Sequence, residues 1–319
     1  MKKLFLLFIF GIVVSCGKES KVEKEIASIP IQFDIERFDL AFANSDSSDL
    51  SKLKNVYPFM FSQRYSDTIW IQKMRDTLQQ ELAFETKKGF NDFQEVKEDI
   101  SQLFQHIKYY KPEFITPRVI TATSSVDYRN KVIVTDTIVL VSLDTYLGSD
   151  HKFYIGIQQY LRQNFNKDQI VVDMAGEYSK KYIYQQQNKK FLDEMIYFGK
   201  QLYFKDLVIP FKTDAEKIGY TEEQIQWAIA NESYIWRYFV ERELLYSTDF
   251  KLANRFIAPA PFSKFQLQDI DNESPGRIGQ YIGWQIVRAY MNNNDVSLND
   301  MLSENAEDIF INSKFKPRK

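Results

Sequence analysis

The stretch 275–291 constrains the fold most, because it keeps a helical pattern while breaking local helix rules. Ser274 and Pro275 are typical of a helix start, since serine caps the first turn and proline lacks only an N–H that this turn leaves unpaired. Gly279 and Gly283 lie one turn apart inside the predicted helix, where each costs roughly 0.8 to 1 kcal/mol relative to alanine. We therefore expect the backbone of another element to pack closely here.

The same stretch combines an apolar stripe with an isolated cation. Ile278, Ile282 and Ile286 recur every four residues, so this face is expected to be buried. Arg277 lies in the first turn, where a cation opposes the helix dipole by a few tenths of a kcal/mol. We therefore expect Arg277 to have an acidic partner. The candidates nearest in the sequence are Asp269, Asp271 and Glu273. For the stretch as a whole, a tightly packed core helix is a simpler explanation than direct contact with a ligand.

The composition is that of a folded protein that does not attract polyanions. Of the 319 residues, 44% are hydrophobic and 15% are aromatic, which is enough for one large core or two smaller ones. The formal net charge is −2, and the only basic run is the short tail 314–319. Nucleic acid is therefore not an expected partner.

The N-terminus is typical of a bacterial lipoprotein signal. Two lysines precede an apolar run, residues 4–14, that is too short to span a bilayer stably, and Ser15 and Cys16 follow it. We expect residues 1–15 to be removed and Cys16 to carry diacylglycerol and an N-acyl chain. No other cofactor is predicted. Two alternatives stay open, namely an ordinary secretory peptide with an incidental cysteine and an uncleaved anchor.

The remainder of the chain is predicted to be one tethered domain. Residues 16–27 are charged and non-periodic, which is typical of a linker, and residues 28–319 form the expected domain. Cys16 is the only cysteine, so no disulfide can form within one chain. The expected location is the cell envelope, where the lipid holds the domain at the membrane, facing the periplasm.

Hydrophobic periodicity predicts an α+β fold that is predominantly helical. Three segments rich in valine, isoleucine and threonine are predicted to form a small antiparallel sheet, and 29–42 is a weaker strand candidate. The segment 249–272 contains prolines and is expected to be an ordered loop. The three predicted strands are 118–123, 131–134 and 137–143. The predicted helices are 67–84, 92–110, 154–165, 169–183, 188–203, 221–247, 297–302 and 305–311.

The chain has few residues that could form a catalytic centre. A zincin needs two histidines one helical turn apart with a glutamate beside the first, whereas His106 and His151 are the only histidines and lie far apart. Neither a nucleophile elbow nor a glycine-rich phosphate loop is present. Glu232 falls on an apolar helical stripe, where a carboxylate requires a partner, and Arg237 or Arg277 could provide one.

Several segments resemble a known family. The segments SLDTYLG (142–148), DEMIYFGK (193–200) and NESYIWRYF (231–239), with the 275–291 stretch, are similar to the gliding motility-associated lipoprotein GldB family over nearly the whole chain. The spacing P-x-x-x-G-x-x-x-G also resembles zincin-like predicted metalloproteases. This resemblance implies a zincin-like domain with a degenerate metal site. Met195 and Gly199 would replace the histidine ligands, Ile196 would replace the base, and Glu232 would take the place of the third, acidic ligand.

The resemblance implies a part in gliding motility, with a link to type IX secretion. We expect a non-catalytic binding or assembly component whose partners are other envelope proteins of gliding or secretion. The alternatives are an active metallopeptidase with non-standard ligands and an inert structural lipoprotein. A cleft that binds a partner could be lined by Asp144, His151, Asn231, Glu232, Trp236, Arg277, Tyr281 and Trp284.

Overall fold

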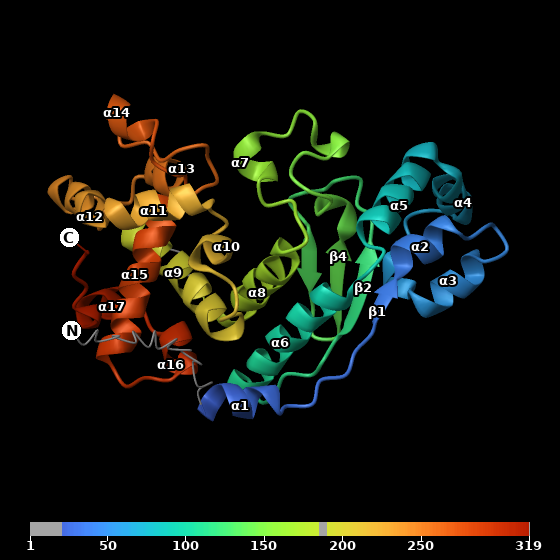
Figure 1. The fold of residues 1–319 in the computed structure, drawn as a ribbon, viewed down its shortest axis with the longest axis horizontal. Helices are drawn as coiled ribbons and strands as arrows, with labels where there is room; N and C mark the ends of the chain where they lie inside the picture. Colours follow the sequence, from blue (N-terminus) through green and yellow to red (C-terminus); the bar gives the residue numbers. More distant parts are fainter. Residues whose placement is uncertain (1–20, 185–189, 319) are drawn as a thin grey trace, which may run out of the picture.

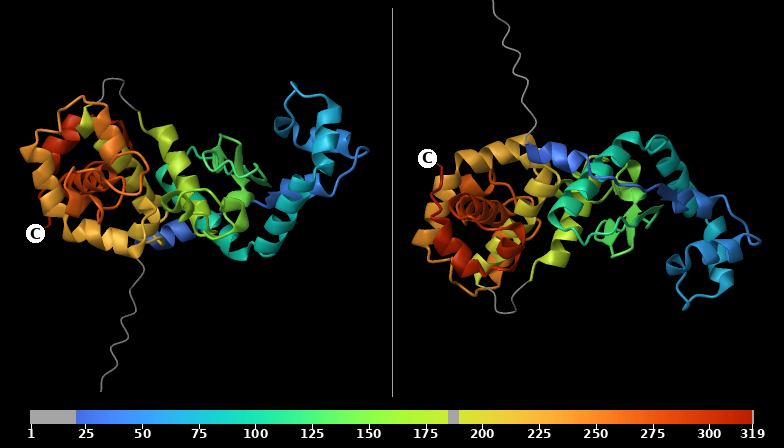
Figure 2. Two further views of the ribbon diagram at one scale, coloured as in Figure 1. Left: turned by 90° about the horizontal axis from the view of Figure 1, so that it is seen from above. Right: turned by 90° about the horizontal axis from the view of Figure 1, so that it is seen from below.

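The computed structural model describes residues 21–184 and 190–318. The chain is predominantly helical, as predicted, and a small sheet lies between a group of short helices and a larger helical part (Figure 1, Figure 2). The helices before and beside the sheet are α1 (Lys21–Ala27), α2 (Phe38–Ala43), α3 (Leu50–Val56), α4 (Asp67–Arg75), α5 (Thr77–Gly89), α6 (Gln94–Tyr110), α7 (Gln159–Arg162) and α8 (Gln169–Tyr182). The larger helical part contains α9 (Phe191–Val208), α10 (Asp214–Ile218), α11 (Glu222–Ala230), α12 (Glu232–Glu241), α13 (Lys251–Phe256), α14 (Gln268–Asp271), α15 (Ile278–Asn293), α16 (Leu298–Ser303) and α17 (Ala306–Ser313). None of the helices in the described ranges is long and apolar enough to cross a membrane.

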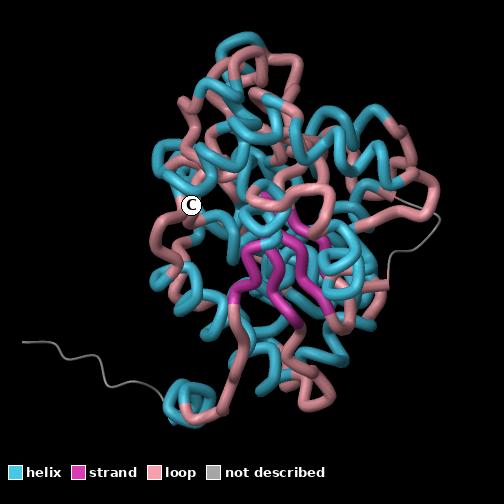
Figure 3. Tube along the Cα trace, turned by 90° about the vertical axis from the view of Figure 1, so that its right-hand side faces the viewer, coloured by secondary structure: helices cyan, strands magenta, loops and turns pink. Residues whose placement is uncertain are grey.

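The sheet has four strands and mixed topology, in the order β1-β2-β4-β3. Its strands are β1 (Ile35–Arg37), β2 (Arg118–Ala122), β3 (Val132–Val134) and β4 (Ile138–Ser142), which Figure 3 shows in magenta among the surrounding helices. β2 pairs in parallel with both β1 and β4, and only β3 and β4 are antiparallel. The predicted three-stranded antiparallel sheet is therefore wrong. Periodicity located the strands, but it does not determine which strand inserts between two others.

The strands separate two hydrophobic cores, because alternate side chains point to opposite faces. Val119 and Val139 face the larger core, which also contains buried residues of α6 and α8. Ile120 and Ala122 face a smaller core with Phe38 of α2. The sheet thus connects the short N-terminal helices to the main body of the protein.

Several predicted helices have different boundaries in the structure. The predicted helix 67–84 is divided at Asp76, whose carboxylate accepts the Gln79 N–H and caps α5. The predicted helix 221–247 is divided at Asn231, and only Gln159–Arg162 is α-helical within 154–165. The predicted loop 249–272 contains α13 and α14. For the helix predicted at 188–203, residues 188 and 189 lie outside the described residues, and α9 continues to Val208.

α1 occupies part of the predicted linker. Its Ile26 is 1% exposed, and its Glu23 carboxylate lies 3.2 Å from Nε2 of His106 on α6. Gln105 of α6 donates to the carbonyl of Ala27. Residues 21–27 are therefore helical and pack on α6. The sequence indicates this only through Val22 and Ile26, which lie one helical turn apart in a charged segment. Cys16 and the predicted signal lie outside the described residues.

α15 packs closely on α9, as the glycines of 275–291 predict. A Cβ atom on Gly283 would overlap the backbone carbonyl of Met195, and one on Gly199 would overlap the carbonyl of Gly283. α15 begins at Ile278 rather than Pro275, because Arg277 has a left-handed backbone conformation with φ of 62°. The Ser263 hydroxyl accepts the Ile278 N–H, so Ser263 caps the helix in place of the predicted Ser274.

Lys200 of α9 is buried against the end of α16, and its titration provides a test of that burial. Its side chain is 4% exposed, its ammonium donates to the carbonyls of Leu302 and Glu304, and burial lowers its pKa to about 8. Between about pH 8 and 10 the unfolded chain binds the extra proton, so this residue makes stability rise with pH. We expect the free energy of unfolding of the wild type to gain about 2 kcal/mol relative to Lys200→Met between about pH 7.5 and 9.5 in urea titrations.

An exposed lysine provides the control for this titration. Lys52 of α3 is exposed, so Lys52→Met should differ from the wild type by the same amount at both pH values. A pH-independent difference for Lys200→Met would contradict the expected titration.

Candidate functional site

The structure does not bring the eight predicted cleft residues together. Glu232 is 2% exposed, and its carboxylate accepts the Tyr281 hydroxyl at 2.7 Å and the Arg318 backbone N–H at 2.8 Å. The Arg318 guanidinium lies 3.9 Å from the same carboxylate. A buried carboxylate with a partner is thus confirmed, but the partner is the C-terminal tail and not the predicted Arg237 or Arg277.

Three further predicted residues stabilise the helical part. Trp236 packs on Phe315 of the tail, at 5.2 Å between ring centroids. Trp284 is fully buried and donates to Asp206 of α9 at 2.8 Å. Asn231 joins α11 to α12, and its side chain donates to the Trp227 carbonyl. These contacts are the ordinary packing of a helical core.

Asp144 and His151 lie on the sheet side of the molecule. The fully buried Asp144 carboxylate accepts the N–H groups of Ser124 and Val126, and burial raises its pKa. Val126 has a φ of 60°, which is strained for a β-branched residue, so Asp144 holds a strained loop. His151 lies 3.5 Å from Glu85 on α5. No hydrogen bond or ion pair within 21–184 and 190–318 joins either residue to Glu232 or Arg277.

The positions proposed for a former metal site are filled by packing. Met195 and Ile196 are buried in α9, and Gly199 lies against the backbone of Gly283. Among the described residues, no three histidine, cysteine, aspartate or glutamate side chains converge as metal ligands do.

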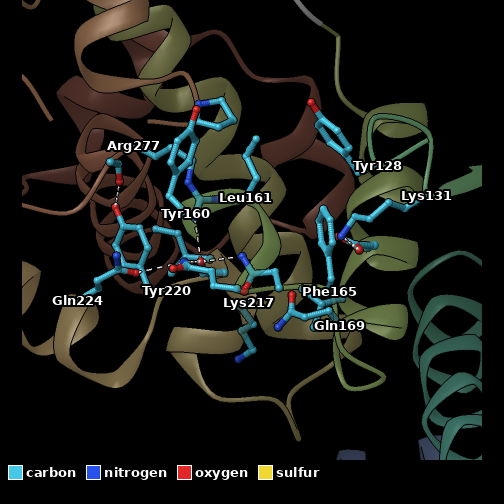
Figure 4. A pocket seen from close by; sticks show the side chains of 18 of the residues that line it. Tyr128, Lys131, Tyr160, Leu161, Phe165, Gln169, Lys217, Tyr220, Gln224 and Arg277 are labelled. Carbon is cyan, nitrogen blue, oxygen red and sulfur yellow. Dashed lines mark hydrogen bonds and ion pairs between the residues drawn. The ribbon is translucent and has the colours of Figure 1, made fainter. Parts of the chain in front are cut away.

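Arg277 lies in a separate pocket of about 260 Å³ between the sheet side and the C-terminal helices. Figure 4 shows Tyr220 and Gln224 on one side of it and Tyr128 and Lys131 on the other. The ionisable side chains around the pocket, besides its tyrosines, are Lys131, Asp173, Lys205, Lys217 and Arg277. This pocket, which we call the basic pocket, is the candidate functional site.

The basic pocket has more positive than negative groups. Lys131 lies 2.5 Å from Asp173, whose carboxylate also accepts the Tyr146 hydroxyl, and Lys217 lies 3.1 Å from Asp206. Within the described part of the chain, neither Lys205 nor Arg277 has a carboxylate contact. Burial lowers the pKa of Lys205 to about 8 and also lowers the pKa of Arg277. An acidic partner for Arg277 is therefore wrong for Glu273 and for Asp271, whose carboxylate accepts the backbone N–H groups of Phe265 and Gln266. The side chain of Asp269 lies outside the described residues.

Gly219 connects three side chains of the basic pocket through its backbone carbonyl. It ends α10 with a φ of 71°, a conformation that favours glycine. Its carbonyl accepts the side chains of Gln163, Asn164 and Arg277 at 2.9 to 3.0 Å. Sequence reasoning missed Gly219 and Lys205. The available signals were the capping box at Thr213, with glycine past the helix end, and a lysine among the apolar residues of α9.

Comparison with known proteins places the chain in a family. The family model for gliding motility protein GldB matches residues 19–317. The chain belongs to the GldB family. This GldB-family protein matches no curated protein. A search of solved structures gave no match. The match includes the basic pocket and the close contact between α9 and α15, so both features lie in the part that the family model describes.

Proposed function

We propose that this protein is a lipid-anchored, non-catalytic component of the gliding machinery that binds other envelope proteins of gliding and type IX secretion. The observation that carries the proposal is the GldB family match over residues 19–317. The lipobox that ends at Cys16 supports the anchor, and the domain would face the periplasm.

The packing of α9 supports the non-catalytic part of the proposal. In a zincin-like domain the metal ligands would occupy the positions of Met195 and Gly199. Here a Cβ atom on Gly199 would overlap the Gly283 carbonyl of α15, so the structure has no room for a histidine side chain at this position. We also propose that the fold descends from a zincin-like domain. Zinc measured in the detergent-solubilised full chain should be far below one ion per chain, and stoichiometric zinc that supports peptide hydrolysis would overturn this part.

The anchor is tested by replacing Cys16 in the chromosomal gene. Cys16→Ser removes the thiol that would be acylated, so we expect the protein to move from the membrane fraction to the soluble fraction and colony spreading to stop. Ser20→Ala, four residues further on, keeps the thiol and should leave both properties unchanged. Membrane retention of the Cys16→Ser protein would contradict the lipid anchor. Normal colony spreading of cells whose Cys16→Ser protein is soluble would contradict the requirement for a lipid anchor.

A further inference from the structure

We propose that the basic pocket binds one small oxyanion group, a carboxylate or a phosphate, between the Lys205 ammonium and the Arg277 guanidinium. Figure 4 shows Arg277 in the wall of this pocket. The inference goes beyond the proposed function and does not depend on it, because it concerns what the isolated protein binds.

The first support is the charge left after all ion pairs are assigned. Lys131 is neutralised by Asp173 and Lys217 by Asp206. Lys205 and Arg277 each donate to one backbone carbonyl, at Lys217 and Gly219 respectively, both at 2.9 Å. An ammonium has three donors and a guanidinium has five, so most of their donors remain available to a ligand. The pocket therefore contains two cations that form no ion pair with a carboxylate of the described residues.

The second support is that this arrangement costs folding free energy. Desolvating a cation without a carboxylate is unfavourable, and the lowered pKa of Lys205 reflects that cost. Arg277 also has a left-handed φ of 62°, a backbone conformation that is strained for a residue other than glycine. Such strain is concentrated at ligand sites, where the surrounding structure maintains it. α15 begins directly after Arg277, so the positive end of its dipole adds to the potential.

The third support is the size and lining of the basic pocket. A volume of about 260 Å³ fits a small molecule or the end of a chain, not a large polyanion. The guanidinium fork matches carboxylate and phosphate geometry, and the ammonium can neutralise a second oxygen. Tyrosine rings and carboxamides line the rest of the pocket and can contact the neutral part of such a ligand. Carboxylate and phosphate share this chemistry, so the probes must distinguish them.

Calorimetric titration of the purified full chain in detergent would test the inference with three probes: inorganic phosphate, N-acetylglycine and the neutral N-acetylglycinamide. We expect at least one of the two anions to bind and the amide not to bind. Binding of phosphate alone assigns a phosphate ligand, and binding of N-acetylglycine alone assigns a carboxylate. Lys205→Gln should weaken anion binding roughly 10- to 100-fold, since it removes one charged hydrogen bond.

Matched variants separate the site from general charge effects. Lys180→Gln removes a nearby exposed charge that is paired with Glu177 and should change affinity less than about threefold. Arg277→Lys keeps the charge but loses the guanidinium fork, so it should weaken anion binding. Lys205→Arg keeps a cation at position 205 and should retain the binding that Lys205→Gln loses. If Arg277→Lys fails to fold, the Lys205 pair of variants still decides the question. Absence of anion binding at about 20 mM, or equal binding of the amide, overturns the inference.

The pH dependence offers an independent readout. The charged groups around Lys205 are Asp173 and Lys180 of α8, Lys131 beside β3, and Arg277, and the last three oppose its protonation. Because the pKa of Lys205 is about 8, affinity for N-acetylglycine should fall as the pH rises from about 7 to 9. The fall should disappear in Lys205→Gln. An affinity that stays constant across this range in the wild type would count against Lys205 as a ligand-binding cation.

Discussion

Replacing Gly283 with alanine is expected to destabilise the protein by about 3 kcal/mol or more, a large fraction of the free energy of unfolding of a typical domain. The added methyl group would overlap the Met195 carbonyl, and backbone cannot rotate away as a side chain can. α9 and α15 would have to separate, and the packing around the buried Ile282 and Ile286 would be lost. Urea denaturation followed by circular dichroism would measure the loss.

Gly176→Ala is the matched control for this substitution. Gly176 also lies inside a helix, α8, but a Cβ atom there would meet only the end of the Lys205 side chain, at 3.5 Å. Helix propensity favours alanine by roughly 1 kcal/mol, so this variant should be as stable as the wild type or slightly more stable. If Gly283→Ala were as stable as Gly176→Ala, the close approach of α9 and α15 would be disproved.

Replacing Asp206 with alanine is expected to cost about 3 to 5 kcal/mol, because it leaves the buried Trp284 indole without an acceptor and removes one of the two carboxylates that bind Arg288. The Asp206 carboxylate accepts the Trp284 indole at 2.8 Å and binds the Arg288 guanidinium and the Lys217 ammonium. These bonds join α9, α10 and α15. The Arg288 guanidinium also lies over the Trp284 ring, at 3.8 Å from its centroid. The same urea titrations, followed by tryptophan fluorescence, would report both the stability and the environment of Trp284.

Asp214→Ala is the control within the same network. Asp214 also binds Arg288, but its side chain is 43% exposed, so its loss should cost about 1 kcal/mol or less. Equal losses for the two variants would show that exposure does not decide how much each carboxylate contributes.

The sequence predicted features that depend on local pattern. Gly279 and Gly283 indicated a close helix contact, and Glu232 on an apolar stripe indicated a buried carboxylate with a partner. Both are confirmed. The identity of that partner could not be predicted. The Arg318 backbone is distant in the chain, and only the fold brings the tail to α12.

Arg277 shows the same limit at the candidate site. Its position in the first turn predicted an acidic partner among its neighbours, because local electrostatics favours one. In the structure the guanidinium donates to Gly219, which lies on a different element. The basic pocket is formed by residues from α8, α9, α10 and the start of α15, so no single segment of the sequence indicates it. The strand order was missed for a similar reason, since pairing partners are chosen by tertiary contacts.

The packing of α1 on α6 limits the distance between the folded domain and a lipid anchor at Cys16. If α1 begins at Lys21 and the acyl chains are attached to Cys16, the connecting backbone spans roughly 17 Å when fully extended. That reach is shorter than the thickness of a bilayer. In a protein anchored in this way, the surface around α1 would stay near the headgroups, and a partner would approach from the side or from above.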